Sequence, residues 1–352
     1  MKKYKRISLL CSICVLFIIS CAKEKETKIN TKEAQNELMA HIRFLASDEL
    51  KGRKPGTEEA KISARYIAEQ FRASGLQSFT NLQGYLQPAV LRIEKNSKEL
   101  NNQLIQSVLC NNVVGYLEGS DSTLKKEYIL LMAHYDHLGI KKDGLVPNSD
   151  SIYNGARDNA MGVTALLYAA KYLSTVELKR SIIFLATTGE EEGMLGSKFF
   201  IEHSPISVEN IVFVLNNDGG GFNDTSLIRI GGMQYINYPV DLTQLIKEEY
   251  QITSLPYPSE YDYLYEKGDN IKFAQKGIPS ITVSPGFDKV DEQITKYVHQ
   301  TCDEVNEDFN LNYLYVFCQV YSSISSYMAN KDTLPFWVKS SKYHSSNCKN
   351  KY

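Results

Sequence analysis

The stretch of sequence that decides the fold lies between residues 128 and 186. It holds two short apolar runs, Tyr128–Ala133 (YILLMA) and Ser181–Ala186 (SIIFLA), and between them a longer one, Ala160–Leu173 (AMGVTALLYAAKYL). Short continuous apolar runs are typical of strands that are buried on both faces, and the longer run is long enough for a buried helix. Strand, helix and strand in this order predict parallel strands joined by a right-handed crossover.

Further elements follow on both sides of this unit. Two more apolar runs, Ile211–Leu215 (IVFVL) and Ile278–Val283 (IPSITV), are predicted to add strands to the sheet. Residues 32–76 have the spacing of two helices separated by a Gly- and Pro-containing break, and Asp303–Met328 is predicted to form one closing helix. We therefore expect an α/β fold, a three-layer α/β/α sandwich with a mixed, mainly parallel central sheet.

The composition is that of an ordinary globular protein. The chain has 352 residues, of which 43% are hydrophobic and 23% are charged, and this balance argues against a disordered chain or a polytopic membrane protein. The formal net charge is -2, so no basic surface is predicted to attract nucleic acid. The sequence carries no signal of the oligomeric state.

The N-terminus has the pattern of an export signal. Basic residues within positions 2–6 precede an apolar run, Ile7–Ile19, that is too short to span a bilayer. Residues 18–21 (IISC) resemble the lipobox of bacterial lipoproteins, in which the cysteine carries the lipid. We predict a signal peptide over residues 1–20, a lipid anchor at Cys21, a tether over 21–31 and a location on a bacterial membrane facing the periplasm or the cell exterior. An uncleaved N-terminal anchor is the alternative.

Polar residues follow three of the predicted strands. The strands run into His134, into the triplet 190–192 (EEE) and into Asp218, while Asp158 lies at the entrance of the buried helix. In open α/β sheets ligands bind outside the carboxyl ends of the strands. Each residue alone has an ordinary explanation, such as a helix cap for Asp158 or a solvated face for the glutamates. Together at one edge they would repel one another without a cation, so a metal site is predicted.

The motifs around these residues resemble those of a known family, the secreted di-zinc aminopeptidases, whose clan also includes glutamate carboxypeptidases and glutaminyl cyclases. The similar segments are 133–139 (AHYDHLG), 154–163 (NGARDNAMGV), 187–197 (TTGEEEGMLGS), 216–218 (NND) and 298–301 (VHQT). The resemblance implies two Zn²⁺ ions. His134 and Asp218 would hold one, Glu191 and His299 the other, and Asp158 would bridge them.

The resemblance also implies roles for residues beside the ligands. Asp136 corresponds to the carboxylate that accepts a proton from the liganding imidazole of His134 and fixes its tautomer. Glu190 corresponds to the general base. Glu192 has no implied catalytic role, and we interpret His137 as a hydrogen-bonding residue rather than a ligand.

Two segments depart from the family pattern. Asn270 stands where many relatives have a histidine, and Val298 stands where many have a tyrosine before the last ligand, with Tyr297 one position earlier. The expected oxyanion stabiliser is therefore missing from its usual place. The tyrosine-rich segment 250–265 is a candidate wall of a pocket for an apolar or aromatic side chain, the alternative being local packing.

We therefore expect one zinc peptidase domain over residues 32–338, followed by a polar tail over 339–352. Aminopeptidase activity on peptides is the first choice. A glutamate-type carboxypeptidase would need a cation to receive a terminal carboxylate, for which Arg157 is a candidate. A glutaminyl cyclase of the clan works with one zinc. An inactive, metal-stabilised binding lipoprotein is the alternative from another class, but it would have no need of Glu190.

Overall fold

The structure, a computed structural model, describes residues 31–96, 103–141, 150–307 and 309–344. The predicted signal peptide, Cys21 and nearly all of the tether lie outside the described residues. Within these ranges, no helix combines the length and the apolar character that a membrane crossing requires.

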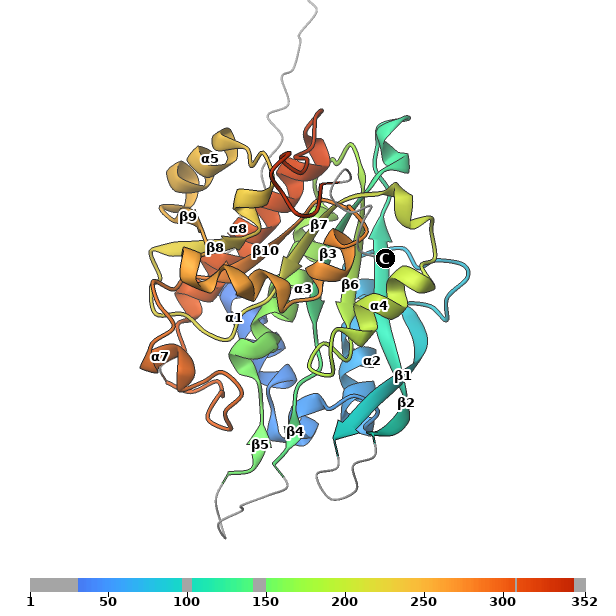
Figure 1. Ribbon diagram of the computed structural model, residues 1–352, viewed down its shortest axis with the longest axis vertical. Helices are drawn as coiled ribbons and strands as arrows, with labels where there is room; N and C mark the ends of the chain where they lie inside the picture. The colour runs from blue at the N-terminus through green and yellow to red at the C-terminus, as the bar shows by residue number, and fades with distance from the viewer. Residues whose placement is uncertain (1–30, 97–102, 142–149, 308, 345–352) are drawn as a thin grey trace, which may run out of the picture.

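The described chain forms an eight-stranded mixed sheet with the strand order β1-β2-β6-β3-β7-β10-β8-β9 (Figure 1). The four strands β6, β3, β7 and β10 are parallel neighbours, whereas β1, β2 and β8 join the sheet by antiparallel pairing. The mixed, mainly parallel sheet is therefore confirmed. The strands are β1 (Leu86–Asn96), β2 (Gln103–Leu117), β3 (Tyr128–His134), β6 (Ser181–Thr187), β7 (Ile211–Asn217), β8 (Leu227–Gly231), β9 (Thr253–Pro256) and β10 (Ser280–Pro285), and a separate small ribbon pairs β4 (Gly139–Ile140) with β5 (Ile152–Tyr153).

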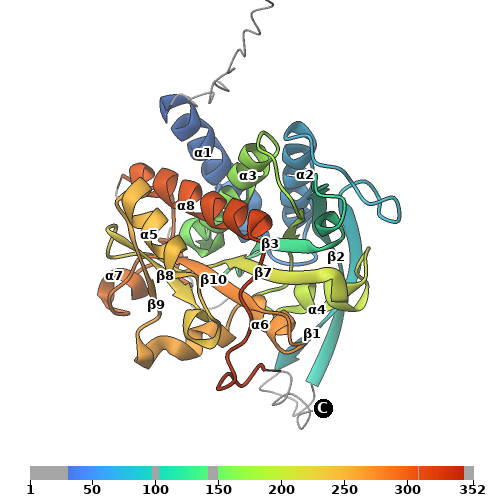
Figure 2. The same cartoon turned by 90° about the horizontal axis from the view of Figure 1, so that it is seen from above.

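Helices cover both faces of the sheet and make the three layers (Figure 2). One face carries α1 (Thr31–Leu45), α2 (Glu58–Ala73), α3 (Met161–Leu173) and α8 (Leu311–Asn330), with α5 (Val240–Tyr250) packed beside α8. The other face carries α4 (Leu195–Glu202) and α6 (Asn270–Ala274), and the short α7 (Glu292–Thr295) lies at the side.

The central strand β3 shows why its sequence is continuously apolar. Its side chains point alternately to the two faces, so Ile129 and Leu131 join the large core beneath the first helical layer, and Leu130 and Met132 join the smaller core beneath α4 and α6. A strand with a helical layer on each face needs apolar residues at every position.

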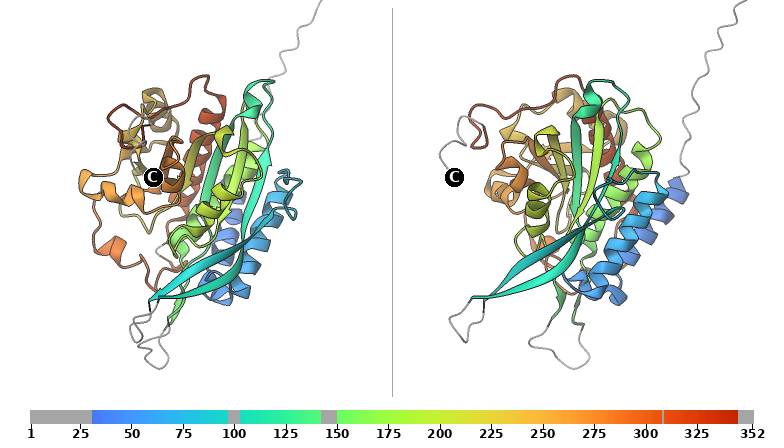
Figure 3. Two further views of the ribbon diagram at one scale, coloured as in Figure 1. Left: turned by 45° about the vertical axis from the view of Figure 1, so that its right-hand side comes forward. Right: turned by 90° about the vertical axis from the view of Figure 1, so that its right-hand side faces the viewer.

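Three features differ from the sequence-based expectations. The long hairpin of β1 and β2, which projects beyond the helical layers in Figure 3, was not predicted. The closing helix α8 begins at Leu311 and not at Asp303, because Asp303 holds another loop in place by hydrogen bonds described below. Part of the predicted polar tail is folded, since Tyr343 is buried against Tyr235 and Trp337.

Candidate metal centre

Three adjacent parallel strands bring the predicted ligands to one edge of the sheet. β3 lies between β6 and β7, so its last residue, His134, is flanked by the segments that follow these two neighbours. Glu190 and Glu191 follow β6, and Asp218 directly follows β7. The convergence of residues that are far apart in the sequence is thus a consequence of the strand order.

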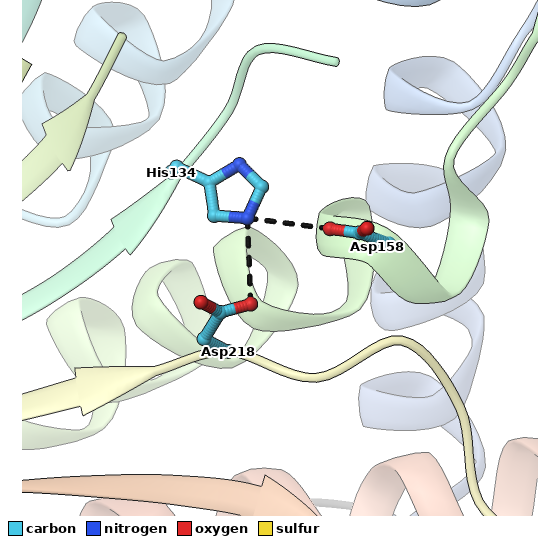
Figure 4. Close-up of side chains that lie close together, drawn as sticks. All are labelled: His134, Asp158 and Asp218. Atoms are coloured by element: carbon cyan, nitrogen blue, oxygen red, sulfur yellow. Dashed lines mark ion pairs between the residues drawn. The ribbon is translucent and has the colours of Figure 1, made fainter. Parts of the chain in front are cut away.

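Asp158 lies between two histidines. Its Oδ1 is 3.3 Å from Nε2 of His134, and its Oδ2 is 3.2 Å from Nε2 of His299. Figure 4 shows His134 facing both Asp158 and Asp218, whose Oδ1 is 3.4 Å from the same Nε2. Each oxygen of one carboxylate therefore faces a different imidazole, which is the arrangement that a bridging ligand requires.

The second cluster forms around Glu191. Its Oε2 is 3.2 Å from Nε2 of His299, and its Oε1 is 2.7 Å from Nδ1 of His137. His299 has a left-handed backbone with φ of 55°, which is uncommon for a residue other than glycine. His137 is fully buried, whereas His299 lines the large cavity described below. His299 is therefore the ligand candidate, and His137 is the residue that holds Glu191.

The position of Asp158 is set by a turn and not by a helix cap. Asp158 belongs to η3 (Ala156–Ala160), the turn that precedes α3, and Gly155 before it has φ of 60°. A Cβ on Gly155 would lie 2.2 Å from the Asp158 carbonyl oxygen, so glycine is required there. The side chain that accepts a hydrogen bond from the start of α3 is Asn159, whose Oδ1 is 3.2 Å from the Gly162 nitrogen. The Asp158 carboxylate is thus free of the capping role.

A buried ion pair ties this turn to the loop of His299. The Asp303 carboxylate accepts hydrogen bonds from the backbone N–H groups of Arg157 (2.9 Å) and Asp158 (3.1 Å) and from Nη1 of Arg157 (3.1 Å). The Arg157 guanidinium also lies over the ring of Tyr297, 3.7 Å from its centroid. Both charged side chains are buried. Arg157 is therefore occupied within the fold and does not line the cavity, which removes it as a receiver of a substrate carboxylate.

The three glutamates that follow β6 have three different surroundings. Glu190 lines the cavity beside His134, and Glu191 contacts the two histidines named above. Glu192 points elsewhere and pairs with Lys54 at 2.7 Å. The triplet is therefore not a uniformly solvated face.

Asp136 differs from the expected arrangement. Its carboxylate Oδ1 is 3.9 Å from Nδ1 of His134, whereas its backbone carbonyl oxygen is 3.2 Å from that nitrogen. The carboxylate instead accepts a hydrogen bond of 3.2 Å from the backbone N–H of Glu190. Asp136 thus contacts the histidine through its main chain and the glutamate loop through its side chain.

The carboxylates of the cluster need a positive charge beside them to be stable. Burial lowers the pKa of His134, but the carboxylates of Asp218 and Asp158 outweigh it and hold that pKa well above its usual range. Hydrogen bonds to Asp158 and Glu191 raise the pKa of His299 to about 10. Burial likewise raises the pKa of Glu190 well above its usual range. Buried carboxylates in such number are stable only beside positive charge, which a metal ion can supply.

The donor set fits zinc. Imidazole nitrogens and carboxylate oxygens are the ligands of open catalytic zinc sites. His134, Asp158 and Asp218 have ligand atoms within 4.8 Å of one another, and so do Asp158, Glu191 and His137. Asp158 is shared by the two groups. His299, the fifth predicted ligand, joins the second group through its contacts with Asp158 and Glu191, so the five predicted ligands are brought together. Asn270 is not part of either group and donates to the Tyr265 carbonyl oxygen at 3.0 Å.

A cavity of about 550 Å³ opens onto the cluster, a volume typical of small-molecule sites. Its walls combine the acids and histidines of the cluster with apolar side chains: Met194, Tyr257, Tyr263, Leu264, Phe287, Val290, Ile294 and Val298. Two tyrosines of the segment 250–265 therefore line the cavity. The Tyr257 hydroxyl is also 2.6 Å from Oγ of Ser284, so this tyrosine combines pocket lining with local packing.

A family model decides the classification. The model of peptidase family M28 matches residues 112–319, a segment that contains all five predicted ligands and Glu190. The chain belongs to peptidase family M28.

Known proteins similar to this M28 chain agree with that family. The alkaline phosphatase isozyme conversion protein of Escherichia coli is 27% identical over 203 residues, which cover 56% of this chain and 52% of that protein. The chain thus spans about half the length of this curated relative. Among solved structures, the zinc aminopeptidase BSAP from Bacillus subtilis has a TM-score of 0.60 at 17% identity and covers 86% of this chain and 96% of that one.

The same fold also occurs in a protein that is named for a different activity. The glutaminyl cyclase of Porphyromonas gingivalis has a TM-score of 0.57 at 15% identity, over 84% of this chain and 97% of that chain. At these identities the solved structures establish the shared fold, the α/β/α sandwich of zinc exopeptidases. Activity has to be argued from the residues of the site.

The sequence did not indicate two contacts of this M28 site. The ion pair of Arg157 and Asp303 and the hydrogen bond of His137 and Glu191 each join residues from different motifs, 146 and 54 positions apart. The one available signal was Asp303 itself, an acid that follows His299 by four positions and that we assigned to a helix.

Proposed function

We propose that the chain is a zinc-dependent exopeptidase that removes N-terminal residues from peptides, with two zinc ions bridged by Asp158. The observation that carries the proposal is the position of the Asp158 carboxylate, whose two oxygens face His134 and His299 at 3.3 and 3.2 Å. In this proposal His134 and Asp218 complete one site, and His299 and Glu191 complete the other.

Zinc, when bound, supplies Lewis acidity that polarises the scissile carbonyl and lowers the pKa of water. Glu190 supplies the proton transfer: its carboxylate lines the cavity, takes a proton from the attacking water and passes it to the leaving amine. Glu191 is held by His137 and His299, so the two neighbouring glutamates serve different purposes.

Asp136 positions both the proposed ligand His134 and the proposed base Glu190. A hydrogen bond from Nδ1 of His134 to the Asp136 carbonyl oxygen keeps the proton on that nitrogen and leaves Nε2 free as a ligand. The Asp136 carboxylate accepts the backbone N–H of Glu190 and so holds the loop that carries the base.

Aminopeptidase activity is our first choice within the clan. Of the four carboxylates that line the cavity, those of Asp158, Glu191 and Asp218 are the proposed zinc ligands, whose charge the metal ions neutralise. Glu190 is the carboxylate left to attract the ammonium group of a free N-terminus. We also propose that the protein is exported and anchored through Cys21 to a bacterial membrane, on the strength of residues 18–21.

One set of peptides tests the function. The purified chain is incubated with a peptide that has a free N-terminus and with the same peptide N-acetylated, each with and without a chelator. Release of the first residue from the free peptide only, lost with chelator and restored by zinc, supports the proposal. Release of the last residue from the acetylated peptide indicates a carboxypeptidase. Cyclisation of a peptide that begins with glutamine indicates a cyclase, and binding without turnover indicates the inactive lipoprotein.

A further inference from the structure

One cation lines the cavity without belonging to the metal cluster. Of the described residues that line it, Lys267 is the only lysine or arginine, and the other charged residues are His134, Asp158, Glu190, Glu191, Asp218 and His299. Lys267 lies directly after η6 (Ser259–Glu266) and shortly before α6. Figure 2 shows α6 on the face of the sheet opposite α3 and α8.

Lys267 has no acidic partner in the described part of the chain. The neighbouring Glu266 pairs with Lys342 and accepts a hydrogen bond of 2.9 Å from the Tyr343 hydroxyl. Asp262, in the same segment, accepts hydrogen bonds from Gln234 and Tyr235. Both acids are therefore engaged elsewhere. Lys267 is exposed and lines the cavity, where it can pair with an anionic group of a ligand.

Gly268 places the backbone next to Lys267 beside the metal-ligand candidates. A Cβ on Gly268 would lie 3.0 Å from Oδ2 of Asp218 and 2.9 Å from the Asn216 amide nitrogen, so the backbone of Gly268 packs directly against a metal-ligand candidate. The Cα of Lys267 is one residue away, about 3.8 Å along the chain. Lys267 and the candidate metal ligands thus line one cavity, and the backbone beside Lys267 packs against Asp218.

We infer that Lys267 binds a carboxylate carried by the leaving residue of the substrate, an inference that rests on the proposed exopeptidase function. Two sources offer this group: the C-terminal carboxylate of a dipeptide, or the side chain of an aspartate or glutamate that follows the scissile bond. An ammonium facing a carboxylate forms a charge-assisted hydrogen bond, which is stronger than a neutral one. The cavity then selects short or acidic peptides over neutral ones.

Two pairs of substrates separate the sources. The first pair is the dipeptide Leu-Leu and its C-terminal amide, and the second is Leu-Glu-amide and Leu-Gln-amide. We expect wild-type kcat/KM to be about two- to fivefold higher for the charged member of at least one pair, mainly through a lower KM, with the advantage falling as salt is added. A preference in the first pair identifies the main-chain carboxylate, and a preference in the second identifies the side chain.

Charge substitutions test the assignment to Lys267. Lys267→Gln should abolish the preference and leave kcat/KM for the neutral members within about twofold, and Lys267→Glu should reverse it. The matched control is Lys276→Gln, an exposed lysine beyond α6 that does not line the cavity, which should behave as wild type. Equal kcat/KM for charged and neutral members in the wild type, or an unchanged preference in Lys267→Gln, overturns the inference while the exopeptidase function stands. Failure of the wild type to cleave any of the four contradicts the proposed function itself.

Discussion

Arg157→Met tests whether the buried ion pair holds the metal centre together. Arg157 is 3% exposed and Asp303 is fully buried, and the substitution leaves the Asp303 carboxylate without its cation. Removal of one partner of a buried pair costs about 3–5 kcal/mol of unfolding free energy. Asp303 keeps the backbone N–H groups of residues 157 and 158, so we expect the lower end, about 3 kcal/mol, or roughly 5 °C in melting temperature for a domain of about 300 residues.

The same variant should weaken metal binding. Asp303 holds the backbone of Asp158, and its own loop carries His299, so loss of the pair loosens both. Outer contacts of this kind are typically worth 10- to 100-fold in metal affinity. The assay is zinc competition with a chromophoric chelator at a temperature at which the variant is folded, as judged by circular dichroism.

A second buried arginine provides the control. Arg180 is also 3% exposed and pairs with Glu127 at 2.7 Å, and it is not among the residues of the cavity. Arg180→Met should lower the melting temperature and leave zinc affinity unchanged. If Arg157→Met does not fold, Asp303→Asn carries the same expectation for zinc. Wild-type zinc affinity in a folded Arg157→Met or Asp303→Asn chain would refute the reasoning.

Three further predictions concern the ligand Glu191, the stability at low pH and the anchor. Glu191→Gln should lower zinc content toward one ion per chain, with activity partly recovered by added zinc, and an unchanged content of two ions by mass spectrometry would count against this ligand. Burial lowers the pKa of His41 to about 4, with Glu37 opposing and Lys171 adding to the shift, so the unfolded chain takes up a proton at a higher pH than the folded chain. Because of this group, the free energy of unfolding should fall by up to about 3 kcal/mol between pH 6.5 and 4. In urea titrations at pH 7 and 4.5, His41→Gln should lack this part of the loss. An equal loss of unfolding free energy in the variant contradicts the prediction. Cys21→Ser should release the protein from the membrane fraction or block its processing, and unchanged membrane association would remove the lipoprotein hypothesis.

The parts of the fold that the sequence predicted are those with helical layers on both sides. β3 and β6 read as continuous apolar runs because both of their faces are buried. β1 is an edge strand, which tolerates Pro88 and exposes Val90, so no apolar run marks it. The start of α8 was misplaced because nothing local shows that Asp303 bonds to a turn 146 positions away.

In the candidate site too, the sequence predicted the residues that belong to clear local patterns and not the contacts that depend on tertiary structure. His134, Asp158 and Asp218 could be named because His134 ends a strand, Asp218 directly follows one, and Asp158 lies shortly before a helix, all three elements having a clear apolar pattern. For His134 Nδ1 we predicted the right residue, Asp136, but the wrong oxygen. The backbone carbonyl oxygen lies at 3.2 Å and the carboxylate at 3.9 Å, and only packing determines which of them is nearer. The sequence also could not show that Lys267 lacks an acidic partner among the described residues. Its two acidic neighbours, Glu266 and Asp262, contact residues that only the tertiary structure brings near them.

The most direct test of the account is Glu190→Gln, measured for metal content and turnover in the same preparation. The substitution keeps the size and hydrogen-bonding capacity of the side chain and removes its proton acceptor. We predict that both zinc ions stay bound while kcat falls 10²- to 10⁴-fold, the usual contribution of general acid–base catalysis, about 3–5 kcal/mol of barrier. Turnover within a few-fold of wild type, or loss of zinc from this variant and not from Glu191→Gln, would contradict the assignment of base and ligand.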